Sequence, residues 1–370
     1  MLTPAAVSQV RRAVRSALLV EDGRAPRWQW DDRVPVGDFL EAVGRHRVAQ
    51  PLAAAAEALA LPEQVAEPIA TGTRDDRLGA MTQVRAIAAV GEALDGLDHL
   101  FLKGAALAVQ LTGDLTARGV GDVDVLVDVG DLEPALDRLR RAGWRVRPQH
   151  ASDPGSWMWG YQRRVAHEVG LEGAAGTVDL HWRLDPTYDA LPSFAELWSR
   201  REPVQVGPTF VATMSRPDAF AHALRHAARD DWGSLRSLVD IHRLARDRDA
   251  WPARPDRLAR TSLTVTEATV GLPDRIPSFR RVRTGLPRAL SAQHRTVRFT
   301  RFPGDAALRY TAYCLAGSRS PRDVGVALAS LVLPPLRVTH VPEHDAARAI
   351  LHGLAARSRP SDAWTSGGEQ

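Results

Sequence analysis

The fold is decided by a stretch that reads LKGAAL at residues 102–107 and, after Arg118, GDVDVLV at residues 121–127. The first part predicts a short apolar strand at 99–102, a glycine turn, and a helix at 105–111. A glycine directly before a helix lets a phosphate approach the backbone N–H groups at the positive helix end, so Gly104 is a candidate phosphate contact. An ordinary strand-to-helix turn is the alternative for this motif taken alone.

The second part places two acids on a predicted strand at 122–127. Residues i and i+2 of a strand point to the same face, so Asp122 and Asp124 project together, while Val123, Val125 and Val127 point into a core. Two adjacent carboxylates repel each other unless a cation is present. Mg²⁺ prefers oxygen ligands and retains substrate phosphates in its shell, so this pair predicts a magnesium site.

A third acid occurs in a similar setting, because Asp179 and His181 share one face of a predicted strand at 177–182. Residues 165–171 are expected to be its hairpin partner, with the turn at 173–176. Three carboxylates on neighbouring strands can hold two metal ions roughly 3.5–4 Å apart, the arrangement used in phosphoryl and nucleotidyl transfer. We therefore expect Asp122, Asp124 and Asp179 to be metal ligands and catalytic residues.

Three further residues are candidates for binding the nucleotide. Lys103 is the only lysine in an arginine-rich chain, and a compact cation suits phosphates crowded against a glycine turn, although chance retention is the alternative. Arg118 could hold triphosphate oxygens, or form a salt bridge to an acid such as Asp114. His181 could orient a metal ligand or touch the acceptor, or could be a buried structural histidine.

Composition excludes several classes of protein. The chain has 370 residues, 44% of them hydrophobic and 25% charged, which suggests two or three domains. A net charge of +4 is too small to imply nucleic-acid binding by itself. Cys314 is the only cysteine, so we expect no disulfides and a cytoplasmic location. The N-terminus has no signal-peptide pattern, and the apolar run at 324–336 is too short to span a membrane.

The hydrophobic pattern divides the chain into four regions. Helical periodicity predicts a helical subdomain at 1–97 and a C-terminal helical region at 206–356, with a mixed α/β core at 98–205 between them. Residues 155–161 are expected to form a loop. The polar segment at 357–370 is expected to be a disordered tail.

These motifs resemble those of the DNA-polymerase-β-type nucleotidyltransferase superfamily, and more narrowly the bacterial uncharacterised nucleotidyltransferase family. The resemblance covers roughly residues 39–244. It implies an α+β fold with a polymerase-β-like core, a small mixed sheet and helical flanks. It also implies metal binding by Asp122 and Asp124, Asp179 as the third acid, and phosphate binding at Gly104. Ala105 departs from the superfamily pattern, which has Ser or a second Gly there, so Lys103 is expected to supply charge instead.

The predicted reaction is transfer of a nucleoside monophosphate from an NTP to an unidentified acceptor, with two Mg²⁺ ions and release of pyrophosphate. The acceptor could be a small molecule, a peptide or a protein. One alternative is a non-catalytic nucleotide-binding scaffold of the same fold. Another is an RNA-directed transferase that uses the arginine-rich tract at 280–301. His222 and His226 have metal-ligand spacing on a helix, but packing or an acceptor-site lining is favoured over a zinc site.

Overall fold

The computed structural model describes residues 3–119, 121–148, 150–252, 255–273, 311–318 and 320–332. The predicted arginine-rich tract at 280–301, a helix expected at 343–356 and the tail at 357–370 lie outside these residues. The chain divides into two compact units. The first comprises Met1–Ala88, Phe101–Val123 and Arg200–Val297, and the second comprises Ala89–Leu100, Asp124–Ser199 and Arg298–Gln370.

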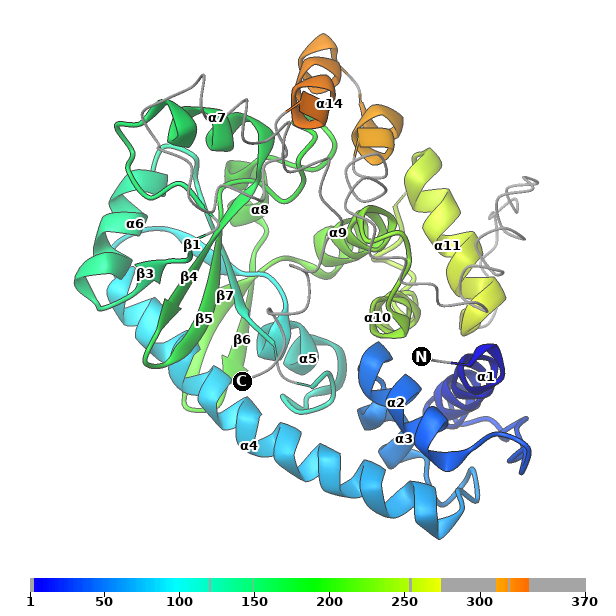
Figure 1. Ribbon diagram of the computed structural model, residues 1–370. Coiled ribbons are helices and arrows are strands. Elements are labelled where there is room, and N and C mark those ends of the chain that lie inside the picture. Colours follow the sequence, from blue (N-terminus) through cyan, green and yellow to red (C-terminus); the bar gives the residue numbers. More distant parts are fainter. Residues whose placement is uncertain are drawn as a thin grey trace. The chain divides into compact units, whose positions relative to one another are not determined.

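The first unit is largely helical. Within it, α1 packs against α2 and α3, and α9, α10 and α11 pack on one another (Figure 1). Its elements, with α4 and β1 continuing into or from the second unit, are α1 (Pro4–Glu21), α2 (Val36–His46), α3 (Ala49–Ala54), α4 (Glu63–Ala93), β1 (His99–Phe101), α5 (Gly104–Thr112), β6 (Glu202–Val206), β7 (Thr209–Thr213), α9 (Arg216–Arg229), α10 (Leu235–Leu244) and α11 (Arg257–Thr269).

Local sequence explains where the helices of this unit begin. The hydroxyl of Thr3 accepts a hydrogen bond from the N–H of Ala6 at the start of α1, and proline follows at the first helical position. The hydroxyl of Ser215 caps α9 in the same way, by accepting from the N–H of Asp218. The helical N-terminal region that periodicity predicted is therefore present, with apolar faces buried against neighbouring helices.

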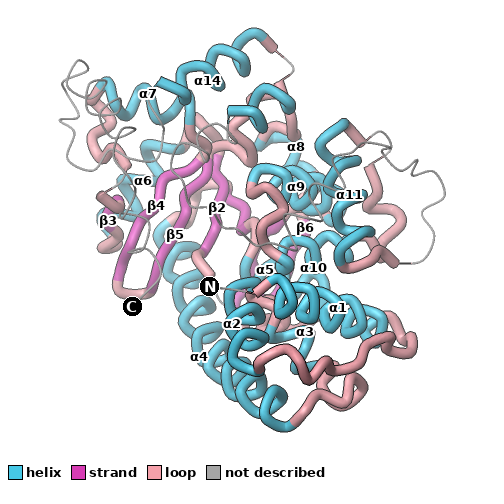
Figure 2. Tube along the Cα trace, turned by 45° about the vertical axis from the view of Figure 1, so that its right-hand side comes forward, coloured by secondary structure: helices cyan, strands magenta, loops and turns pink. Residues whose placement is uncertain are grey.

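The second unit carries most of the strands. The hairpin of β4 and β5 is seen as two neighbouring strands in Figure 2. The elements are β2 (Val123–Val127), α6 (Leu132–Arg141), β3 (Arg145–Val146), α7 (Trp157–Val165), β4 (Glu168–Gly173), β5 (Gly176–His181), α8 (Phe194–Ser199) and α14 (Pro321–Val332).

The strands form one mixed sheet in the order β3-β4-β5-β2-β1-β7-β6. Strand β1 pairs with β7 in parallel, whereas the pairs β3–β4, β4–β5 and β6–β7 are antiparallel. In the β4–β5 hairpin, Glu168 lies opposite His181 and Gly170 lies opposite Asp179. The α+β fold with a mixed sheet and flanking helices is thus confirmed.

Two local predictions were wrong. Residues 157–165 form helix α7, not a loop, because the hydroxyl of Ser156 caps the helix and Trp159 is buried. The β6–β7 hairpin was missed because the chain from residue 206 onward was predicted to be helical. Strand β6, which contains Pro203, is the last strand of the sheet, where a residue without an N–H group is tolerated.

Segments at both ends of the described chain are tied to their own unit by polar contacts. In the first unit, Glu21 at the end of α1 forms an ion pair with Arg243 of α10 at 3.0 Å. In the second unit, buried Asp185 accepts a hydrogen bond from the hydroxyl of Tyr313. The N–H of Tyr188 donates to Asp323 of α14 at 2.7 Å.

Candidate functional site

The glycine turn is built as the sequence predicts. Lys103 has an extended backbone after β1, and Gly104 begins α5 with φ +60°. A Cβ atom at Gly104 would lie 2.6 Å from Nε2 of Gln83, which is closer than such atoms approach. Glycine is therefore required at this position both by the left-handed backbone and by the side chain packed against it.

Gln83 of α4 joins the glycine turn to the acid pair. Its Nε2 donates to the carbonyl oxygens of Gly121 at 2.9 Å and Asp122 at 3.3 Å. This buried amide therefore holds the backbone that enters β2 beside the turn at Gly104. The sequence analysis missed Gln83. The only signal was a polar residue among apolar residues on one face of a helix.

The acid pair has the expected alternation. Val123 and Val125 are buried, whereas Asp122 is exposed and Asp124 is partly exposed. Asp122 immediately precedes β2, so the strand is one residue shorter than predicted. The two carboxylates are oxygen donors held away from the apolar core, and this donor chemistry fits Mg²⁺.

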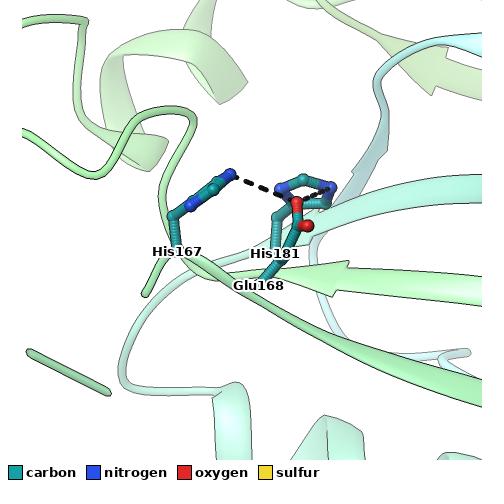
Figure 3. A group of neighbouring side chains, drawn as sticks. All are labelled: His167, Glu168 and His181. Atoms are coloured by element: carbon teal, nitrogen blue, oxygen red, sulfur yellow. Dashed lines mark ion pairs between the residues drawn. The ribbon is translucent and has the colours of Figure 1, made fainter. Parts of the chain in front are cut away.

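In the second unit, Asp124 belongs to a cluster that the sequence analysis found only in part. Nε2 of His181 lies 3.2 Å from Oδ1 of Asp124 and 3.4 Å from Oε2 of Glu168. Nε2 of His167 lies 3.2 Å from the same oxygen of Glu168. Figure 3 shows both imidazole rings directed at this carboxylate. His181 thus touches Asp124 and is itself buried, so the contact leaves open whether it orients a metal ligand or is a structural histidine.

Asp179 has a different environment. Its Oδ1 accepts a hydrogen bond from Arg147 at 2.8 Å. Gly170, opposite Asp179 in the hairpin, leaves the space that this guanidinium occupies, because a Cβ there would lie 2.8 Å from Nε of Arg147. The third predicted acid is therefore ion-paired in this structure, with a partner that the sequence analysis missed.

Arg118 is likewise ion-paired, but not with Asp114. Its Nε and one terminal nitrogen donate to the two carboxylate oxygens of Asp240 at 2.8 and 2.7 Å, and both side chains are buried. Asp114 instead accepts from the N–H and hydroxyl of Thr116. Two of the five donors of Arg118 are thus committed to α10, which fixes the orientation of the guanidinium.

The two histidines of α9 pack against each other. The rings of His222 and His226 meet edge to face with centroids 5.8 Å apart. Burial lowers the pKa of His226 well below its usual value, and the positive charges of Lys103 and Arg229 lower it further. Neutral His226 therefore lies in the positive field of the only lysine, in line with packing or site lining.

A comparison with known families places most of the chain in one family. The model of a family described as uncharacterised nucleotidyltransferase matches residues 32–269. A comparison with individually curated proteins found no match. The matched range contains every candidate site residue named above. Among the described residues, no helix combines the length and apolar composition needed to cross a bilayer.

Proposed function

The chain belongs to the uncharacterised nucleotidyltransferase family, and on this premise we propose that it transfers a nucleoside monophosphate from an NTP to an acceptor nucleophile and releases pyrophosphate. The observation that carries the proposal is the Gln83 bridge. Its amide packs against Gly104 of the glycine turn, which suits a phosphate, and donates hydrogen bonds to the strand entry that bears the acid pair. A phosphate-binding element and a metal-binding element are thereby coupled through one buried side chain.

On the nucleotide side, the backbone N–H groups at the start of α5 bind phosphate oxygens, and Lys103 supplies a compact positive charge beside them. Arg118 stays oriented by Asp240 and adds positive potential to the same region. These groups position the NTP and stabilise the charge that develops on the leaving pyrophosphate.

On the metal side, Asp122 and Asp124 are the proposed ligands of two Mg²⁺ ions. Bound Mg²⁺ would neutralise the triphosphate and make the attacking hydroxyl group more acidic. Asp179 is the proposed acceptor of the proton from that hydroxyl group. Arg147 holds the Asp179 carboxylate on the strand face that it shares with His181.

The test uses the purified full chain with Mg²⁺, each NTP labelled in the α-phosphate, and a lysate that supplies acceptors. We expect labelled product and pyrophosphate from the wild type, and neither from Asp122→Ala or Asp124→Ala. Asp128→Ala is the matched control, because Asp128 follows the same strand and its carboxylate accepts from the N–H of Gly130. Full activity in either acid variant would refute the proposal.

The same assay separates catalysis from nucleotide binding alone. Mg²⁺-dependent NTP binding without pyrophosphate release, across a broad acceptor panel, would favour the non-catalytic scaffold. Transfer that requires RNA and is lost at high salt would favour the RNA-directed alternative.

A further inference from the structure

Three side chains of the second unit converge on a small volume at one end of the β4–β5 hairpin. The ligand atoms of His167, Glu168 and His181 all lie within 4.8 Å of one another. Two imidazole nitrogens and one carboxylate oxygen are therefore available at one centre (Figure 3). Asp124 is a further carboxylate beside this group, because its Oδ1 lies 3.2 Å from Nε2 of His181.

The spacing of these atoms suits a tetrahedral metal ion. Zinc is bound by imidazole and carboxylate at about 2.0–2.1 Å, so two ligands of a tetrahedral site lie about 3.3 Å apart. The contacts His167–Glu168, His181–Asp124 and His181–Glu168 measure 3.2, 3.2 and 3.4 Å. Little movement is thus needed for an ion to enter among His167, Glu168 and His181, and Asp124 is close enough to His181 to complete the site.

Hydrogen bonding does not account for both carboxylate contacts of His181. A neutral imidazole carries one N–H hydrogen, yet Nε2 of His181 contacts carboxylate oxygens of both Asp124 and Glu168. His181 is only 1% exposed, and among the described atoms its Nδ1 has no hydrogen-bond partner. Nε2 of His181 can donate its one hydrogen fully to only one of these two carboxylates. A cation bound between the groups would attract both carboxylates together.

The hairpin register explains why these residues meet. Glu168 and His181 are directly opposite each other on β4 and β5 and share one face. The carbonyl oxygen of His167, just before β4, accepts from the N–H of Trp182 at 3.0 Å, which fixes the backbone beside His181. The ligand set is therefore positioned by strand pairing and needs no induced loop.

We propose that His167, Glu168 and His181, with one oxygen of Asp124, bind a transition-metal ion of the Zn²⁺ class. Imidazole ligands favour Zn²⁺, Cu²⁺, Fe²⁺ or Ni²⁺ over Mg²⁺, which prefers oxygen ligands and retains several waters. With four protein ligands, this ion has a structural role that orients Asp124. The site shares Asp124 with the magnesium site proposed above but differs from it in its two imidazole ligands, and its existence does not require the transfer reaction.

The experiment measures metal binding by the full chain, independently of activity. Protein stripped with a chelator is titrated with Co²⁺ for the visible absorption of a tetrahedral N/O site, and Zn²⁺ binding is measured by equilibrium dialysis. We expect one tight ion per chain that excess Mg²⁺ does not displace. His167→Gln and Glu168→Gln each remove a ligand and should weaken binding at least about a hundredfold.

Two matched controls locate the ion. Glu172→Gln changes an exposed glutamate of the same strand, and His226→Gln changes one of the paired histidines of α9. Both should bind Zn²⁺ as the wild type does. Unchanged binding in His167→Gln and Glu168→Gln, or loss of binding in His226→Gln alone, would overturn the proposal, as would ready displacement by Mg²⁺.

Folding and catalysis are controlled separately. Circular dichroism of each metal-free variant reports whether it folds. Zn²⁺ should raise the thermal unfolding midpoint of the wild type and of both controls, but not that of the His167→Gln and Glu168→Gln variants. Asp122→Asn should lose transfer and keep Zn²⁺ binding. A protein that binds Zn²⁺ but transfers no nucleotide would refute the proposed function and support the metal site. A protein that transfers nucleotide but binds no Zn²⁺ would refute the metal site and support the proposed function.

Discussion

Replacing Gly104 by alanine tests the packing of the glycine turn. Its φ of +60° places an alanine in the left-handed region, at a cost of about 1–2 kcal/mol. The new Cβ would lie 2.6 Å from Nε2 of Gln83, so that side chain must move and lose its 2.9 Å hydrogen bond to Gly121. Losing this bond adds about 0.5–1.5 kcal/mol, so the expected total is about 1.5–3.5 kcal/mol.

Gly113 provides the matched control at the other end of α5. It has φ +74°, but a Cβ there would meet nothing within 4 Å. Gly113→Ala should therefore cost only the backbone term of about 1–2 kcal/mol. Urea denaturation followed by circular dichroism compares the two variants, in the wild-type background and in Gln83→Ala, where the contact is absent.

The refuting outcomes are specific. If Gly104→Ala costs no more than Gly113→Ala, Gln83 does not constrain the turn. If Gly104→Ala remains more costly than the control in the Gln83→Ala background, some other contact is responsible. In either case Gln83 would no longer be evidence that the glycine turn and the acid strand are coupled, and the proposed function would lose that support.

Three further predictions concern stability. Burial lowers the pKa of His46 to about 4, so as the pH falls through 6.5 the histidine is protonated in the unfolded chain but stays neutral in the folded chain. The free energy of unfolding should therefore fall by about 2 kcal/mol between pH 7.5 and pH 5. His46→Gln should reduce this pH dependence, and an unchanged profile would contradict the assignment. Arg118→Ala leaves Asp240 buried without its main partner and should cost about 3–5 kcal/mol, with a smaller cost when both are replaced by apolar residues of similar volume, as a double-mutant cycle can measure. Arg322 lies 3.6 Å over the ring of Tyr188, so Tyr188→Ala should expose α14 to limited proteolysis, whereas Tyr188→Phe should not, and equal cleavage would argue against the stacking.

The part of the site that could be predicted depends on local periodicity. Alternation along residues 121–127 placed Asp122 and Asp124 on the face opposite the buried valines, and the structure has the same alternation. The glycine turn was predictable because a strand, a glycine and a helix follow one another within a few residues. Several of the strands were predictable because they are short and apolar and are bounded by turn residues. The β6–β7 hairpin was not predicted, and the mixed sheet was implied by the family resemblance.

The missed residues act through contacts that are distant in sequence. Gln83 is 38 positions from Gly121, and Arg147 is 32 positions from Asp179. No local pattern marks such pairs, because they are set by how helices and strands pack. Glu168 is different, since the predicted hairpin turn determines the register. Pairing outward from the turn would have placed Glu168 opposite His181 and revealed the cluster of histidine and glutamate side chains.

The polar contacts at the two ends of the described chain bear on where this fold can be cut. Residues 32–269 match the family, yet Glu21 and Tyr313 lie outside that range and supply partners to Arg243 and Asp185 inside it. A chain trimmed to the matched range would bury a guanidinium and a carboxylate that have each lost a partner. The range recognised by family comparison is therefore shorter than the segment that must be kept for each unit to satisfy its own buried charges.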